Sequence, residues 1–301
     1  MSYGSDIVSN IEGFSTAMYS TWAYYRPERI MFDAGEGVSM SMRNFVFGIE
    51  RIFVSHGHHD HIGGLMGIIG SRSAARGDKG KPLVIYYPKG WDTIAGLQRY
   101  VGEAYRNLSY DLSWIPVEAG SRVTLSGEGQ KAKSVRVFQV THTRNLALGF
   151  QIVENRSRLK KEFVGMPGKD IGRIRKEKGN DSVMENYEYV SLTFSGDTSP
   201  LDDGICNDSE VLMHEATFVD PEDIDRNGHS SVADAVRVAA ASKVKELVLY
   251  HLSSRYTTKE AITAVRVAVQ KSGFTGGVSL LDGRSMIRIT NNVIQIGEGK
   301  V

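Results

Sequence analysis

Short apolar runs alternate with segments of helical periodicity along the whole chain. The runs that predict strands are Arg51–Ser55, Pro82–Tyr87, Ser134–Thr141, Tyr189–Ser195, Val211–Met213, Glu246–Tyr250 and Ser285–Thr290. The segments that predict helices are Ile62–Ala74, Trp91–Leu108, Val232–Ala241 and Lys259–Ser272. In the last of these, Ile262, Val265 and Val269 recur at the spacing that places side chains on one helix face. This alternation predicts a layered α/β fold rather than a helical bundle or an all-β sandwich.

Composition narrows the classes of protein that the chain can belong to. Its 301 residues, 41% of them hydrophobic, can form one large domain that spans residues 1–301. Lys and Arg number 36 against 35 Asp and Glu, so any binding of RNA must come from local charge. No leader pattern or membrane-length apolar run is present, which predicts a cytoplasmic protein without a membrane partner. Cys206 is the single cysteine, which excludes internal disulfides and cysteine-based zinc clusters.

One stretch departs from this balanced charge. The segment Arg156–Gly179 holds nine basic side chains against Glu162, Asp170 and Glu177. It predicts a short, exposed, basic insertion at about 156–179. Two interpretations stay open, a solvated loop with a mixed-charge helix or an arm that contacts a partner.

The strongest chemical signal is the segment Ser55–His61, with the sequence SHGHHDH, directly after the apolar run IERIFV. Imidazole and carboxylate groups suit zinc and neighbouring first-row metals. Other candidate ligands also follow expected strands. They are His142, Asp197, His214 and His251. Because an open α/β sheet presents its site at the carboxyl ends of its strands, we expect such residues to converge.

The motif His-x-His-x-Asp-His, formed here by His56, His58, Asp60 and His61, resembles the signature of the metallo-β-lactamase superfamily. The resemblance implies a four-layer αββα sandwich. It also implies two metal ions and a ligand set: His56, His58 and His142 for one ion, Asp60, His61 and His251 for the other, and Asp197 bridging them. By the same resemblance, Asp33 in FDAGEG orients a ligand histidine, while His59 lines the cleft.

Four further elements are similar to the tRNase Z family: FDAGEG, SGDT, HEAT followed by His229-Ser230-Ser231, and HLSSRY. Their order matches that family from about residue 30 to about residue 260. The resemblance implies a zinc-dependent phosphodiesterase, an endoribonuclease that removes 3′ trailers from precursor tRNA. It further implies two Zn²⁺ ions per subunit, with Mn²⁺ or Fe²⁺ as alternatives, and a homodimer.

Catalytic roles follow from the same resemblance. Asp60 is expected to bind one zinc ion and to help orient the attacking water. Glu215 and His229 would form a carboxylate–imidazole pair, in which His229 protonates the leaving 3′-oxygen. The alternative is that Glu215 caps a helix and His229 lies at the surface.

Substrate contacts are expected at two places. Arg255 and Ser253, close after His251, could clamp a phosphate. The alternative is that Arg255 is a surface arginine, which is the commoner case for any single arginine. In the family, a protruding arm grips the tRNA elbow. Here the corresponding residues are Lys169, Arg173 and Arg175. The segment Ser71–Ser73 suggests either a contact with RNA backbone or a helix-end cap.

The N-terminal segment GFSTAMYSTWAYYRPERI departs from the family's glycine-rich opening and from its loop with proline and basic residues. Two alternative functions therefore stay open. One is a two-zinc hydrolase of the same fold that acts on a small phosphodiester or sulfate ester. The other is a catalytically silent RNA-binding relative, against which the complete ligand set argues.

Overall fold

The computed structural model describes residues 3–74, 80–129, 132–143, 146–223, 228–289 and 294–297. Their strands form two sheets in chain order. The first contains β1 (Ile11–Thr16), β2 (Ser20–Tyr25), β3 (Ile30–Phe32), β4 (Arg51–Phe53), β5 (Leu83–Pro88) and β6 (Leu112–Val117). The second contains β7 (Arg122–Ser126), β8 (Lys133–Val140), β9 (Ala147–Leu159), β10 (Met184–Phe194), β11 (Val211–Glu215), β12 (Glu246–Tyr250), β13 (Gly277–Asp282), β14 (Ser285–Ile289) and β15 (Ile294–Gly297).

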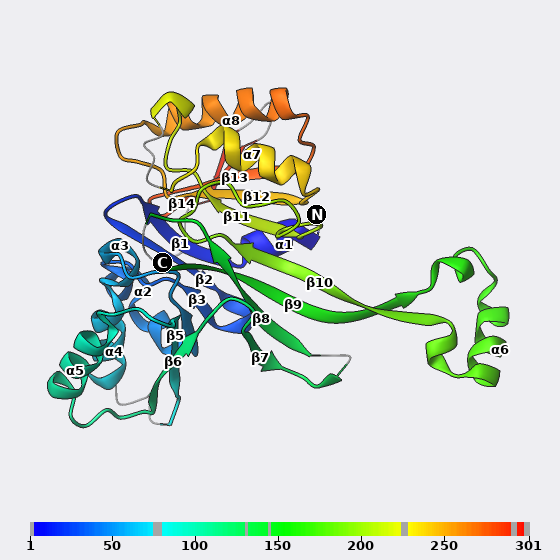
Figure 1. The fold of residues 1–301 in the computed structure, drawn as a ribbon, viewed down its shortest axis with the longest axis horizontal. Coiled ribbons are helices and arrows are strands. Elements are labelled where there is room, and N and C mark those ends of the chain that lie inside the picture. Colours follow the sequence, from blue (N-terminus) through cyan, green and yellow to red (C-terminus); the bar gives the residue numbers. More distant parts are fainter. Residues whose placement is uncertain are drawn as a thin grey trace.

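Helices cover the outer faces of both sheets (Figure 1). The helices of the described residues are α1 (Tyr3–Ser9), α2 (Val38–Met42), α3 (His59–Ile62), α4 (Leu65–Ala74), α5 (Ile94–Ala104), α6 (Gly168–Lys178), α7 (Val232–Ala241) and α8 (Thr258–Ser272). Short 3₁₀ helices span Arg26–Glu28, Arg43–Gly48, Lys161–Phe163, Asn180–Ser182 and Pro221–Asp223. Within the described residues, no helix combines the length and the apolar character needed to cross a membrane.

Three apolar clusters hold the layers together. Side chains of α2, α4 and α5 pack on the first sheet, and those of α7 and α8 pack on the second. The third cluster lies between the sheets, where the rings of Phe32 on β3 and Phe194 on β10 stack with centroids 5.0 Å apart. The expected four-layer αββα sandwich is confirmed.

Local sequence signals explain the best-predicted helices. At α7, Ser231 and Asp234 form a reciprocal capping box, and Thr257 and Glu260 do the same at α8. Gly273 ends α8 in the left-handed conformation, at φ +69°. The capping boxes start α7 at its predicted residue and α8 within one residue of its predicted start, and both helices end at their predicted residues.

Other boundaries differ from the prediction. The helix expected over Ile62–Ala74 is two helices, α3 and α4, because a turn at Gly63 and Gly64 separates them. The helix expected over Trp91–Leu108 is the shorter α5. Thr290, the last residue of one predicted strand, lies outside the described residues.

The segment Arg156–Gly179 belongs to an arm that projects from the second sheet (Figure 1). Strands β9 and β10 pair antiparallel as far as Leu159 and Met184, and the arm's outer end carries α6. No residue of α6 is buried, and Val183 is the one buried residue between residues 154 and 190. The arm is therefore exposed along its length.

Candidate metal centre and active site

Five strands end at one edge of the two sheets, and each is followed by a candidate polar residue. Asp33 follows β3, His56 follows β4, His142 follows β8, Asp197 follows β10 and His251 follows β12. Strands β3 and β4 are parallel, as are β10, β11 and β12, so their carboxyl ends meet at the same edge. The sequence therefore folds these residues to one place, as a site at the strand ends requires.

Asp60, His61, Asp197 and His251 form a tight group at this edge. The Asp197 Oδ2 atom lies 3.2 Å from His61 Nε2 and 3.2 Å from His251 Nε2. Asp60 Oδ2 lies 3.2 Å from the same His251 nitrogen and 3.5 Å from His61 Nε2. All four residues are buried. The carboxylates of Asp60 and Asp197 thus contact the same two imidazoles, and the ligand atoms of Asp60, His61 and His251 lie within 4.8 Å of one another.

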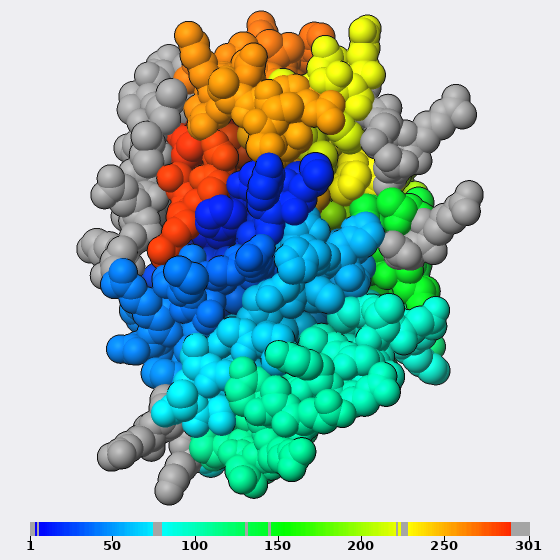
Figure 2. Space-filling model, turned by 90° about the vertical axis from the view of Figure 1, so that its left-hand side faces the viewer, coloured from blue at the N-terminus to red at the C-terminus, as the bar shows by residue number. Residues whose placement is uncertain are grey.

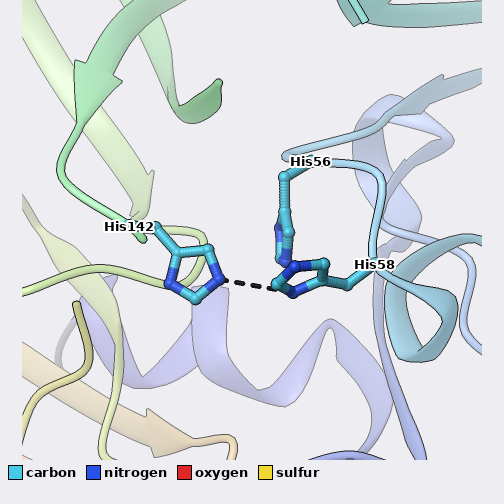
Figure 3. Close-up of side chains that lie close together, drawn as sticks. All are labelled: His56, His58 and His142. Carbon is cyan, nitrogen blue, oxygen red and sulfur yellow. Dashed lines mark hydrogen bonds between the residues drawn. The ribbon is translucent and has the colours of Figure 1, made fainter. Parts of the chain in front are cut away.

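Three histidines form an adjoining group (Figure 3). His142 Nε2 lies 3.3 Å from His58 Nδ1, and the rings of His56 and His58 are 4.5 Å apart. His56 Nε2 lies 3.8 Å from Asp197 Oδ2. Asp197 therefore stands between the two groups, and the donor atoms of His56, His58 and His142 lie within 4.8 Å of one another.

In four of these histidines, the ring nitrogen that faces away from the cluster contacts an oxygen atom of another residue. The contacts are Ser55 Oγ for His56 at 3.0 Å, Asp33 Oδ2 for His61 at 2.7 Å, the Gly228 carbonyl oxygen for His142 at 3.1 Å and Thr217 Oγ1 for His251 at 2.9 Å. In metal sites, such contacts fix the ring orientation and leave the other nitrogen as the ligand atom.

Three of these supporting residues carry no role in the sequence prediction: Ser55, Thr217 and Gly228. Ser55 directly precedes His56, Thr217 closes the HEAT element, and Gly228 directly precedes His229. Gly228 has φ +75°, and a Cβ atom there would lie 2.8 Å from the Cα of His142. Their proximity to the motifs was the available signal, but motif position alone does not show which oxygen faces which ring.

The cluster contains buried polar atoms that the protein leaves without a hydrogen bond. Among the described residues, His56 Nε2 and Asp197 Oδ1 have no hydrogen-bond partner, although both side chains are almost fully buried. Buried polar atoms without partners are costly, and a bound cation removes that cost. The imidazole and carboxylate donor set therefore fits metal ions.

Electrostatics favour the metal-binding forms of His56, His142 and Asp197, whereas the His61 ring must lose a proton when its Nε2 atom binds a metal. Burial holds the pKa of His56 well below its ordinary value and lowers the pKa of His142, so both rings are neutral at pH 7. Burial would raise the pKa of Asp197, but His251 and His61 outweigh it and hold that pKa well below its ordinary value. For His61, burial lowers the pKa, but Asp197 and Asp33 outweigh it and raise the pKa well above normal.

Two residues at the site adopt a backbone conformation that is rare for residues other than glycine. Asp33 has φ +57° and His251 has φ +64°. Such conformations persist where surrounding contacts enforce them, and they occur often at ligand sites. Asp33 accepts hydrogen bonds from Ser55 N at 2.7 Å and from Ser55 Oγ at 2.8 Å, and His251 N donates to Ser15 Oγ at 2.7 Å.

Glu215 and His229 lie together beside this cluster. Glu215 Oε1 is 2.9 Å from His229 Nδ1, and Glu215 Oε2 accepts from the backbone and the hydroxyl of Thr217, both at 2.9 Å. The His229 ring stacks on His251 with centroids 5.4 Å apart. Glu215 is fully buried at the end of β11, and Ser231 is the residue that caps α7. The alternative role of Glu215 as a helix cap is therefore wrong.

The remaining predicted contacts fall in different places. Arg255 is exposed in the loop after His251, with its guanidinium 5.6 Å from the ring centroid of Phe218. Ser253 lies in the same loop and is partly exposed. His59 is exposed, with Nε2 3.4 Å from a carboxylate oxygen of Glu36, and it is not among the clustered donors.

The suggested RNA contact at Ser71–Ser73 is wrong for Arg72. Its side chain is buried and donates to the carbonyl oxygens of Val46, Ile49 and Lys81. Lys169, Arg173 and Arg175 lie on α6 in the arm, away from the metal cluster (Figure 1). This helix carries five basic side chains against two acidic ones, and none of its residues is buried.

Comparison with known proteins identifies the group of proteins to which this arrangement belongs. The sequence model of the Metallo-beta-lactamase superfamily matches residues 28–144, which include the His-x-His-x-Asp-His motif. A Ribonuclease Z of Halorubrum lacusprofundi is 31% identical over 286 residues, which cover 87% of this chain and 88% of the relative. The chain belongs to the ribonuclease Z family. It is a metal-dependent phosphodiester hydrolase.

Other members and solved structures agree with this assignment. A Ribonuclease Z of Pyrococcus horikoshii is 31% identical, with 77% of this chain and 80% of the relative covered. The crystal structure of the short form of human tRNase Z superposes with a TM-score of 0.58 at 22% identity, covering 81% of this chain and 93% of that one. The metallo-beta-lactamase fold protein YhfI of Bacillus subtilis gives a TM-score of 0.61 at 15% identity, covering 91% and 98%. These two structural likenesses show the fold.

Proposed function

We propose that this chain is a zinc-dependent endoribonuclease that removes 3′ trailers from precursor tRNA. Membership of the ribonuclease Z family supports the substrate class. The observation that carries the proposal is the position of the Glu215–His229 pair directly beside a cluster of seven potential metal ligands. That arrangement offers both a metal centre and a group that can protonate a leaving oxygen.

The ligands that we assign form two sets. His56, His58 and His142 would hold one zinc ion, Asp60, His61 and His251 would hold the other, and Asp197 would bridge them. Support comes from the close approach of the donor atoms within each group and from the position of Asp197 against both. When bound, two such ions polarise a phosphodiester and lower the pKa of water. The same donors suit Mn²⁺ or Fe²⁺, which metal analysis of the purified protein distinguishes from Zn²⁺.

The chain's own groups would carry the proton transfers and the orientation of the reactants. Asp33 and Thr217 hold the rings of His61 and His251 in the orientation that directs Nε2 into the cluster. The carboxylate of Asp60 would orient the attacking water. His229 would donate a proton to the leaving 3′-oxygen, while Glu215, paired with its Nδ1 atom, keeps the ring in place and stabilises its cationic form.

Substrate would be held at two places. Arg255 and Ser253, in the loop after His251, would contact phosphates close to the cleaved bond. Lys169, Arg173 and Arg175 on α6 would bind phosphates farther along the tRNA. The compact ammonium group of lysine and the planar guanidinium of arginine can both bind phosphate. We regard the arm as part of a single domain spanning residues 1–301. We expect the active form to be a cytoplasmic homodimer. Light scattering would measure its mass.

The test compares variants on a precursor tRNA with a labelled 3′ trailer and on bis(p-nitrophenyl) phosphate. We expect His61→Ala to abolish cleavage of both, because it removes a metal ligand. We expect His229→Ala to lower kcat on the RNA by about 10²- to 10⁴-fold, the typical contribution of a general acid. His59→Ala, a matched change at an exposed histidine in the same motif, should keep wild-type activity.

Two results would contradict the proposal. If the zinc-loaded protein hydrolyses the small diester but leaves the RNA intact, its substrate is smaller or different. If His229→Ala cleaves the RNA at the wild-type rate, the Glu215–His229 pair only supports the fold.

A further inference from the structure

The turn between β1 and β2 places two large side chains in solvent beside the candidate metal centre. Strand pairing ends at Thr16 and Ser20, which leaves Ala17, Met18 and Tyr19 at the tip. Met18 is 84% exposed and Tyr19 is 61% exposed, whereas Ala17 is buried. In Figure 2, the dark-blue hairpin lies in the middle of its face of the molecule, between the orange segment of the chain and the lighter blue one.

The tip is fixed to both sides of the metal centre by backbone hydrogen bonds. Met18 N donates to Asp60 Oδ2 at 3.0 Å, and Ala17 N donates to the carbonyl oxygen of Leu252 at 3.0 Å. The strand leading to it is fixed as well, because Ser15 Oγ accepts from His251 N at 2.7 Å. The backbone that carries the exposed side chains therefore has a defined position relative to Asp60 and His251.

The backbone of the tip is also unusual. Met18 has φ +70°, a conformation that residues with a Cβ atom adopt rarely. Such strain occurs often where the surrounding structure positions a ligand. Here it accompanies the bond from Met18 N to Asp60 and turns two apolar side chains outward rather than into the core.

We propose that Met18 and Tyr19 form a platform on which a base flanking the cleaved phosphodiester stacks. This inference rests on the proposed function, since a phosphodiester held at Asp60 and His251 must bring its two flanking nucleotides to the rim of that site. Aromatic rings bind unpaired bases by stacking and tolerate any base, because every base has a flat face. A tip with no charged side chain suits a base better than a phosphate.

The experiment uses precursor tRNAs in which the nucleotide on one or the other side of the cut carries no base. We expect the wild type to lose about 5- to 150-fold in kcat/KM on one of these substrates, the range typical of a stacked base. Tyr19→Ala should lose a similar factor on the intact substrate and show no further loss when the base is removed. Tyr19→Phe should behave as wild type, whereas Tyr19→Leu, apolar but without a flat ring, should behave as Tyr19→Ala.

The control is Tyr100→Ala. Tyr100 lies on α5 and is 59% exposed, almost the same as Tyr19, but α5 contributes no residue to the metal cluster. This variant should keep both the wild-type rate and the wild-type sensitivity to the missing base.

Each contrary outcome has a separate meaning. If the wild type does not cleave precursor tRNA, the proposed function fails and the platform fails with it. If the wild type cleaves but Tyr19→Ala retains full sensitivity to the missing base, the platform alone is wrong. If Tyr19→Ala changes the mass seen by light scattering and not the base sensitivity, a second copy of the chain covers the tip, which also overturns the inference.

Discussion

Replacing Asp33 with Asn tests whether contacts to the outer ring nitrogens of the ligand histidines determine metal affinity. The Asp33 carboxylate accepts from Ser55 N and Ser55 Oγ and lies 2.7 Å from His61 Nδ1. Asn has the same shape and tolerates φ +57° better than most residues, so the backbone should not change. Its amide nitrogen, however, is a donor. Facing His61, it favours the ring form with hydrogen on Nε2, the atom that points at Asp60 and Asp197.

The expected loss follows from the value of such contacts in metal proteins. Removing one typically costs 10- to 100-fold in metal affinity, which is about 1.4 to 2.7 kcal/mol. Competition with a chromophoric chelator measures the affinity, and circular dichroism checks that the fold is kept. Glu36→Gln is the matched control, because Glu36 is exposed and contacts only His59 among the histidines of the motif. A folded Asp33→Asn protein that binds zinc with wild-type affinity would show that the contact from Asp33 to His61 does not control metal binding.

Three further changes test other parts of the molecule. Gly228→Ala should weaken zinc binding in the chelator assay, because its Cβ would lie 2.8 Å from the Cα of His142 and displace that ligand. Unchanged affinity would show that His142 is not displaced. Cys206 should react with Ellman's reagent far more slowly in the native protein than in guanidinium, since the thiol is fully buried and burial raises its pKa; rapid native labelling would contradict this burial. Neutralising the arm should raise KM for precursor tRNA and reduce the slope of log KM against log salt by roughly 2 to 3, while leaving turnover of a small diester unchanged. The variant combines Lys169→Ala, Arg173→Ala and Arg175→Ala.

The sequence predicts those parts of the fold where one local signal dominates. Val232–Ala241 has a capping box at its start and a regular apolar face, and both of its ends were predicted correctly. Strands β1 and β2 were not predicted, because almost all of their residues are buried and no alternation marks them. All of β9 was missed. Its inner half is continuously buried, like β1 and β2, and its outer residues in the arm are half-buried or exposed and pair with β10.

The candidate ligands could be predicted because histidines and aspartates at strand ends are visible in the sequence. Their supports could not. Thr217 holds His251 across 34 residues of chain, and the Gly228 carbonyl holds His142 across 86, so only the packing of the sheets shows these pairs. Arg72 also could not be placed from the sequence, because its burial depends on carbonyl groups at the end of the 3₁₀ helix Arg43–Gly48.

Mapping the RNA ends after incubation of the zinc-loaded protein with a precursor tRNA shows whether the protein removes the 3′ trailer. We expect a single cut between the mature 3′ end and the trailer, which leaves a 3′-hydroxyl on the tRNA and a 5′-phosphate on the trailer, and we expect His61→Ala to abolish the cut. Scattered cuts, a 2′,3′-cyclic phosphate at the new end or cleavage that persists in His61→Ala would contradict the proposed function.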